Sequence, residues 1–315
     1  MNAFTAPYFQ TAEAARVAIE GIRWPHGPVC GRCGETERRY ATKRPGRYRC
    51  GNPACRKDYS VTTGTVMEST HIPLNKWLMG FYLMCSSKKG VSAHQMHRSL
   101  GVTYKTAWFL EHRIREAMRS GGLLPPMGGE GKIVEADETY FGKYDEPRER
   151  KTKRYTQPTK GGRSGPANKR AIVSLVERGG NVRSFHVAVA DGDTVGRIVR
   201  ENIAHESRLH TDESKLYVKP GADFAAHETV NHSSKEYVRD DVHTNSAEGY
   251  FSIFKRGMKG IYQHCAEKHL HRYLAEYDFR YNHRIALGVD DLARTLAAVQ
   301  GAEGKRLTYR QANVA

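Results

Sequence analysis

The sequence predicts a protein of mixed α+β and α/β class, built from three consecutive parts. Four of the six cysteines fall within residues 30–55, a spacing typical of a small metal-binding module. Residues 73–118 carry the apolar periodicity of helices throughout. Beyond a segment rich in Gly and Pro, short β-rich runs are followed by helical segments. These observations predict a metal module, a helical segment and an α/β domain, in that order.

The composition excludes several classes of protein. The 315 residues include 50 Lys and Arg against 34 Asp and Glu, a formal net charge of +16 at pH 7. Such a basic surface attracts polyanions, which argues against an ordinary metabolic enzyme and for a nucleic-acid partner. No apolar run approaches the roughly 18 residues that a membrane span needs, and we recognise no secretory signal. We therefore expect a cytoplasmic protein without a membrane partner.

Two cysteine pairs predict one structural zinc site. Cys30 and Cys33 form a first knuckle, and Cys50 and Cys55 form a second, with 16 residues between the knuckles. Two such knuckles each give two thiolates to one tetrahedral Zn²⁺ ion. The alternative, four buried cysteines without a metal, rarely has this spacing, and disulfides do not persist in a reducing compartment. We therefore predict a helix and a zinc ribbon within residues 1–66.

The helical segment at residues 67–120 has the form of a helix-turn-helix. A short helix from Ser92 to Leu100, a turn at Gly101 and a longer helix over residues 103–118 are expected. The start of the second helix carries the residue types that meet base edges and phosphates, namely Thr103, Tyr104, Lys105 and Thr106. The alternative is a small helical bundle that acts only as a spacer.

The elements beyond a linker at residues 121–131 occur in an order typical of one fold. Three strands are predicted at residues 132–141, 170–177 and 182–189, and then a helix, two short strands and a helix at 194–204, 208–212, 229–232 and 245–258. This is the order of the ribonuclease-H-like fold, which by itself does not determine function. We assign it to residues 132–290, with a basic insertion at 142–170 and a C-terminal tail at 291–315.

Three acidic residues lie where the elements of this fold would converge. Asp137 is on the first strand, Asp212 ends a later strand, and Glu248 lies at the edge of the buried face of the last helix. Three carboxylates in one place would raise one another's pKa unless cations lie between them. Two Mg²⁺ or Mn²⁺ ions would neutralise them and support an in-line phosphoryl transfer. A single acid is usually a solvated surface charge, so the interpretation depends on the element context.

Several stretches of the sequence carry a family resemblance. They are Arg23–Gly34, Val134–Lys143, His210–Ser214, His243–Arg256 and Tyr273–Arg284. In these stretches the chain resembles the DDE transposases of bacterial insertion sequences, in particular the ISXO-like group with an N-terminal zinc ribbon. The stretches occur in the same order as in that group and span most of the chain.

The resemblance implies a nuclease and strand transferase. Such an enzyme binds the terminal inverted repeats of its element, cuts the DNA and joins the freed 3′-OH to target DNA, and we expect a homo-oligomer on DNA in a bacterial nucleoid. It further implies that Asp137, Asp212 and Glu248 hold the two metals. Lys255 would contact phosphate, together with Arg256. Asn245 shares a helix face with Glu248 and is the alternative third ligand.

The basic insertion leaves two interpretations open. It is either a disordered charged loop or a DNA-binding loop, in which case Lys151, Lys153 and Arg154 are the expected contacts. Function also has alternatives: an inactive DNA-binding repressor derived from such an enzyme, or a nuclease that cuts without joining.

Overall fold

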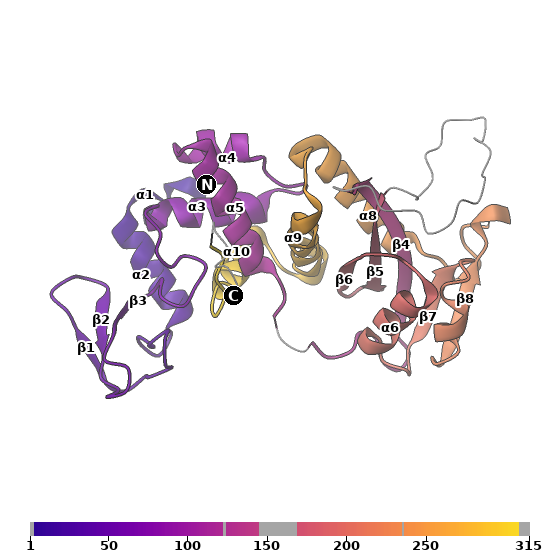
Figure 1. Cartoon of the computed structure of the whole chain (residues 1–315), viewed down its shortest axis with the longest axis horizontal. Coiled ribbons are helices and arrows are strands. Elements are labelled where there is room, and N and C mark those ends of the chain that lie inside the picture. Colours follow the sequence, from indigo (N-terminus) through magenta and orange to yellow (C-terminus); the bar gives the residue numbers. More distant parts are fainter. Residues whose placement is uncertain (1–2, 122–123, 145–168, 235, 309–315) are drawn as a thin grey trace. The chain divides into compact units, whose positions relative to one another are not determined.

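The computed structural model of the chain describes residues 3–121, 124–144, 169–234 and 236–308. These residues form two compact units (Figure 1). The first unit contains the chain up to Ser120 together with the chain from His283 onward, and the second contains residues 121–282. Each unit has its own hydrophobic core and is described separately.

The first unit begins with short helices and a three-stranded antiparallel sheet. The helical elements are η1 (Ala3–Thr5), α1 (Pro7–Gln10) and α2 (Ala12–Arg23), and the strands, in the order β1-β2-β3, are Arg39–Ala41, Arg47–Cys50 and Asp58–Ser60. Tyr48 pairs with Tyr59 across β2 and β3, and the ring of Trp24 packs edge-on against both. An aromatic cluster therefore packs against the small sheet.

Helices complete the first unit. They are α3 (Leu74–Ser86), α4 (Ala93–Leu100), α5 (Tyr104–Met118), η6 (Ile285–Leu287) and α10 (Asp291–Gln300). The α4–turn–α5 arrangement agrees with the sequence prediction. Ser92 caps α4 by accepting a hydrogen bond from the backbone N–H of Gln95, and Gly101 ends the helix with a φ of 58°. A left-handed residue at this position closes the turn, which explains why glycine occupies it.

The C-terminal segment corrects one expectation. Residues 291–315 were expected to form a tail, but α10 packs on α3, α2 and α5 of the first unit. Asp290 caps this helix, and its Ala298 and Val299 are fully buried. Arg294 donates a 2.8 Å hydrogen bond to the carbonyl oxygen of Cys85 on α3. The α/β domain therefore ends at residue 282, and the helix that follows it completes the core of the first unit.

The second unit is built on a five-stranded mixed sheet with the order β6-β5-β4-β7-β8. The strands β4, β5 and β6 form an antiparallel meander, whereas β4, β7 and β8 are parallel. Their bounds, in chain order, are Ile133–Lys143, Lys169–Glu177, Val182–Val187, Arg208–Asp212 and Ala226–Val230. Three antiparallel strands followed by two parallel ones make this the predicted ribonuclease-H-like sheet.

Helices cover both faces of this sheet (Figure 1). The helices are α6 (Gly192–Asn202), α7 (Val218–Gly221), α8 (Asn245–Gly257) and α9 (Leu270–Asn282), with short turns η3 (His232–Ser234), η4 (Met258–Tyr262) and η5 (Glu267–His269). Val134 and Ala136 of β4 pack with α6 on one face, whereas Ile172 and Val176 of β5 pack with α8 and α9 on the other. Because side chains alternate along a strand, Glu135 and Asp137 lie on the face that α8 covers.

None of the helices in the described ranges is long and apolar enough to cross a membrane.

Candidate active site and metal centre

The four clustered cysteines converge on one point in the first unit. Their Sγ atoms all lie within 4.8 Å of one another, with Cys33 and Cys50 3.5 Å apart and Cys30 and Cys55 4.0 Å apart. Tetrahedral coordination with Zn–S bonds of about 2.3 Å requires sulfur separations of about 3.8 Å. The two loops bring the thiols together without a disulfide. The donor set and its spacing therefore fit one structural Zn²⁺ ion.

The three predicted acids come together where the middle of β4, the carboxyl end of β7 and the start of α8 meet. Asp137 lies within β4, Asp212 is the last residue of the neighbouring parallel strand β7, and Glu248 is in the first turn of α8. Burial raises the pKa of Asp137 well above its usual range, and the charges of Asp212, Glu138 and Glu248 raise it further. Burial raises the pKa of Asp212 as well. The structure therefore assembles a cluster of carboxylates whose negative charges oppose one another.

This cluster is looser than the cysteine site. Within the described part of the chain, the four cysteines are the set of metal-ligating side chains whose donor atoms converge, and the acids do not form a set of that kind. The acids do offer the oxygen ligands that Mg²⁺ and Mn²⁺ prefer. Asp137 is also desolvated among like charges, an arrangement that a cation stabilises. The donor chemistry therefore fits divalent cations.

Glu135 fixes the start of the helix that carries Glu248. The residue before α8, Thr244, provides no side-chain cap. Instead the Glu135 carboxylate, fully buried on β4, accepts hydrogen bonds of 2.8 and 3.1 Å from the backbone N–H groups of Ser246 and Ala247. A carboxylate at this end of a helix satisfies free N–H groups and interacts favourably with the helix dipole. The strand that bears Asp137 thus caps the helix that bears Glu248.

Arg178 joins the same network. Its guanidinium donates hydrogen bonds of 3.0 and 2.8 Å to Glu135, 2.8 Å to the carbonyl oxygen of Asp241 and 3.2 Å to that of His243. The ion pair is buried on the Glu135 side and compensates the charge of that carboxylate. The loop that leads into α8 is therefore held against the sheet on both sides of Thr244.

Lys255 and Asn245, also predicted from the sequence, lie on α8 with Glu248. Burial lowers the pKa of Lys255, whereas the charge of Asp137 raises it, so this amine lies near the carboxylate cluster. Its Nζ is 5.9 Å from the centre of the Phe251 ring. Asn245 is the exposed first residue of the helix, and Arg256 is also exposed.

Two groups beside the cluster were not predicted. His232 of η3 has its Nδ1 atom 3.6 Å from Glu248, and its charge lowers the pKa of Asp212. Glu138 points to the opposite face of β4, where its carboxylate accepts a 2.9 Å hydrogen bond from the buried Tyr217 hydroxyl. In the sequence, only the position of Glu138 next to Asp137 indicates that it lies beside the carboxylate cluster. Nothing in the sequence around His232, a single histidine in a loop, indicates the same.

Some of the side chains predicted to contact DNA in the first unit already make hydrogen bonds within the protein. The Thr103 hydroxyl caps α5, accepting a 3.3 Å hydrogen bond from the backbone N–H of Thr106, and lies 2.8 Å from the Thr106 hydroxyl. Tyr104 is 44% exposed and stacks near His94, and Lys105 is exposed. Thr103, Tyr104 and Lys105 are therefore exposed and Thr106 is half-buried, while the two threonine hydroxyls already make hydrogen bonds within the protein. Lys151, Lys153 and Arg154 lie outside the described residues.

Two protein-family models match the chain. Residues 128–282 match the ISXO2-like transposase domain, and residues 10–58 match the transposase zinc-ribbon domain. The first range covers the five-stranded sheet with its helices, and the second contains all four clustered cysteines.

Individual proteins are similar as well. An uncharacterized protein in transposable element ISH50 of Halobacterium salinarum is 28% identical over 254 residues, which are 79% of this chain and 83% of the relative. That relative is archaeal, so the bacterial source expected from the sequence stays a prediction. A chain of the simian T-cell lymphotropic virus intasome, solved in complex with the PP2A regulatory subunit B56 gamma, aligns over 58% of this chain and 63% of its own length at 12% identity. The TM-score of this alignment is 0.28.

Proposed function

The chain belongs to the ISXO2-like transposase family and carries a transposase zinc ribbon, and from this premise we propose that it is an active DNA transposase. It would bind the terminal inverted repeats of its element, cut at the element ends and join the freed 3′-OH to target DNA. The observation that carries the proposal is the cluster of Asp137, Asp212 and Glu248 where the neighbouring strands β4 and β7 meet α8. The net charge of +16 supports DNA as the partner.

The same three carboxylates would hold two Mg²⁺ or Mn²⁺ ions. When bound, such a pair of ions stabilises the attacking and leaving oxygens of a phosphoryl transfer. Glu248 rather than Asn245 is the proposed third ligand, because its charge acts directly on Asp137. An amide at position 245 would offer only a neutral oxygen. The Glu135 cap would keep Glu248 at a fixed place relative to Asp137.

Other side chains of the chain would bind and orient the DNA. The amine of Lys255, half a helix length from Glu248 on α8, would contact a phosphate beside the reacting one. Arg256 next to it is exposed and would contact the backbone further away. Tyr104 and Lys105 at the start of α5 would meet DNA in the first unit, and Lys151, Lys153 and Arg154 of the basic insertion are further proposed contacts. We also propose a homo-oligomer on DNA.

One assay tests the proposal and separates it from the alternatives. The purified protein is incubated with Mn²⁺, a labelled DNA carrying the element end and a supercoiled target plasmid. Both cut ends and joined products are expected. Cutting without joining would favour a nuclease, and binding without either product would favour a repressor. Either result would contradict the proposed function.

A further inference from the structure

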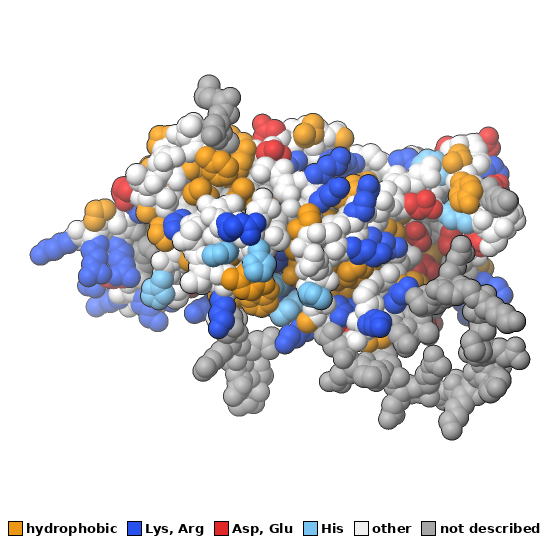
Figure 2. All heavy atoms as spheres, turned by 90° about the horizontal axis from the view of Figure 1, so that it is seen from above, with side chains coloured by type: hydrophobic (Ala, Val, Ile, Leu, Met, Phe, Trp, Pro, Cys, Tyr) orange, Lys and Arg blue, Asp and Glu red, His pale blue; other side chains and the backbone are white. Residues whose placement is uncertain are grey.

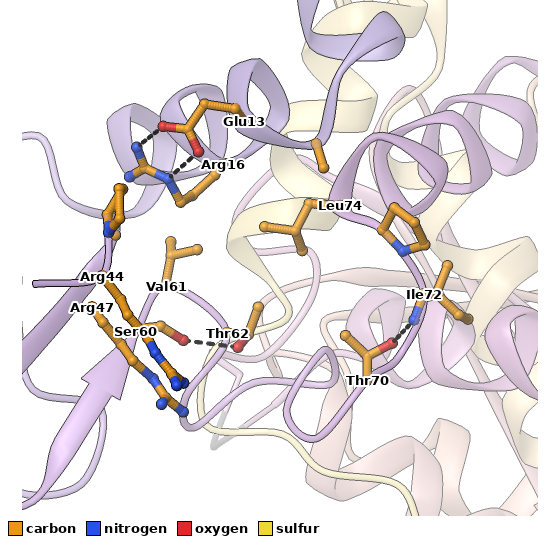
Figure 3. A pocket seen from close by; sticks show the side chains of 14 residues that line it. Glu13, Arg16, Arg44, Arg47, Ser60, Val61, Thr62, Thr70, Ile72 and Leu74 are labelled. Carbon is orange, nitrogen blue, oxygen red and sulfur yellow. Dashed lines mark hydrogen bonds and ion pairs between the residues drawn. The ribbon is translucent and has the colours of Figure 1, made fainter.

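An open groove in the first unit, lined by both apolar and charged side chains, lies far along the chain from the acidic cluster. It has a volume of about 640 Å³ and is lined by the start of α2, the β1–β2 hairpin and the segment that leads from β3 to α3 (Figure 3). Its lining includes Arg44 and Arg47 of the hairpin and Ser60, Val61 and Thr62. The groove is therefore formed by parts of the zinc ribbon together with the helix that precedes it.

Two of the three arginines that line the groove are available for a ligand. Arg16 is ion-paired with both Glu13 and Glu20 on its own helix, so its charge is already compensated. Arg44 and Arg47 are exposed and have no acidic partner in the described part of the chain. Figure 3 shows their side chains next to each other and extending in the same direction, toward Ser60 and Thr62. Two like charges held together in this way attract an anion.

Backbone hydrogen bonds order the turn that carries these two arginines. In the hairpin turn, Arg47 N–H donates a 3.1 Å hydrogen bond to the carbonyl oxygen of Arg44, and Thr42 N–H donates 3.0 Å to that of Arg47. Gly46 has a φ of 70° and lies so close to the Arg16 side chain that a Cβ atom there would be 2.3 Å from its Cδ. The ion-paired Arg16 thus supports the turn that presents Arg44 and Arg47. The turn therefore fixes the points at which the two arginine side chains leave the backbone.

Two hydroxyl groups also line the groove. The Ser60 and Thr62 hydroxyls are 3.0 Å apart, and both line the groove (Figure 3). Between residues 38 and 60, eight Lys and Arg stand against one acid, Asp58. Figure 2 shows these basic side chains, in blue, gathered over the end of the first unit that holds the ribbon. A flexible acidic peptide would need only the positive charge, whereas planar guanidinium groups together with hydroxyl donors suit phosphodiester groups.

We infer that this groove binds the phosphate backbone of duplex DNA, with Arg44 and Arg47 each donating to a phosphate and with Ser60 and Thr62 as supporting donors. The inference rests on the proposed function only in taking DNA as the partner. It makes the zinc ribbon and α2 a DNA-contacting module separate from α5. Contacts with the phosphate backbone of the DNA fix the position of the protein along the duplex, but they do not read the base sequence.

The test measures the affinity of the full-length, zinc-loaded protein for a labelled duplex over a series of salt concentrations. A double variant, Arg44→Ala with Arg47→Ala, is compared with Lys43→Ala with Lys57→Ala, which removes two exposed charges of the same ribbon outside the groove lining. For the groove variant we expect binding about 10-fold to 100-fold weaker at low salt, with a salt slope smaller by about 1.8, equal to two phosphate contacts. The control variant should change both quantities much less.

The outcomes separate this inference from the proposed function. Equal losses in the two double variants, or unchanged binding in the groove variant, would overturn the groove as a phosphate site. Zinc content and circular dichroism of each variant identify a folding defect, and Arg44→Lys with Arg47→Lys provides a second measure, because it keeps the charge and loses the planar fork. Partial recovery of affinity is expected for that lysine pair. The assay contains no divalent metal beyond the bound zinc and measures no cutting, so failure of catalysis would leave this result unaffected.

Discussion

The carboxylate of Glu135 accepts a 2.8 Å hydrogen bond from the backbone N–H of Ser246, although 111 residues separate the two in the chain. Glu135 lies two residues before Asp137 on β4, and Ser246 lies two residues before Glu248 on α8. One buried side chain thus links the two elements that carry two of the three candidate metal ligands. The site depends on this link as well as on the ligands themselves.

The first prediction concerns this link. Glu135→Ala leaves the Arg178 guanidinium without its buried partner and the first N–H groups of α8 without an acceptor. Breaking a buried pair in this way should lower the free energy of unfolding by about 3 to 5 kcal/mol. Urea unfolding measures this change, and calorimetric Mn²⁺ titration at a temperature where the variant is folded should show weaker metal binding.

The matched control is Ser246→Ala, which removes only the 3.0 Å hydrogen bond from the Ser246 hydroxyl to Glu135. It keeps both backbone bonds, so we expect a loss of about 1 kcal/mol and little change in Mn²⁺ affinity. If Glu135→Ala were no more destabilising than this control, Glu135 would not be the cap that positions α8.

The second prediction ranks the two candidate third ligands. Glu248→Gln removes a charge that acts on Asp137, whereas Asn245→Ala removes a neutral amide. In the cutting assay with Mg²⁺, Glu248→Gln should lose activity by a factor of about 100 or more, and Asn245→Ala should retain most of it. Gel-shift affinity for DNA is expected to be equal in both variants. The opposite ranking would transfer the third position to Asn245.

The third prediction concerns the zinc site. The purified protein should contain about one equivalent of Zn²⁺, and Cys50→Ser should lose the metal and the fold of the ribbon together. The Trp24 ring packs on Tyr48 and Tyr59 of the ribbon, so the tryptophan emission should shift in this variant. The buried Cys85, outside the quartet, provides the control: Cys85→Ala should keep its zinc. A metal-free protein with a fully protected ribbon would rule out a structural zinc.

The fourth prediction concerns pH. Burial raises the pKa of Asp278 to about 6, although the residue accepts hydrogen bonds from the backbone N–H and hydroxyl of Ser184 and from the Tyr250 hydroxyl. Because the folded state holds this proton more tightly than the unfolded chain, with its pKa of about 3.9, the contribution of Asp278 to stability is present below about pH 4 and is lost as pH rises through about 6. The difference amounts to about 3 kcal/mol.

The measurement compares the wild type with Asp278→Asn, which cannot titrate. The free energy of unfolding of the wild type minus that of the variant should fall between about pH 4 and pH 7, because only the wild type loses its favoured proton. A difference that stays constant with pH, or that rises, would show that Asp278 is ionised throughout.

Local sequence signals were enough to predict much of this fold. Knuckle spacing located the Cys30–Cys55 quartet, and the order of strands and helices predicted the arrangement that brings Asp137, Asp212 and Glu248 together. The predictions of the cysteine quartet and of the fold succeed because each depends on spacing within one element or on the order of elements, which a single sequence displays directly. The role of the three acids as metal ligands stays a prediction.

Other features depend on contacts between distant segments. The partners of Glu135 are known only once β4 and α8 are packed, and nothing near position 135 in the sequence indicates that this acid is buried. In the same way, the amphipathic pattern of α10 predicts a buried face but does not identify α3 as its neighbour. His232 approaches Glu248 through the loop after β8, whose path has no local signature. The partners of Glu135, the neighbour of α10 and the position of His232 all depend on tertiary packing.

The most direct test of the account is a metal-specificity measurement at Asp137. We predict that Asp137→Cys binds the element end normally, is inactive in cutting and joining with Mg²⁺, and regains part of its activity with Mn²⁺, which accepts a thiolate more readily than Mg²⁺ does. Asp137→Ala should be inactive with both ions. Activity of Asp137→Ala with Mg²⁺ comparable to that of the wild type would contradict the central claim that Asp137 holds a catalytic metal.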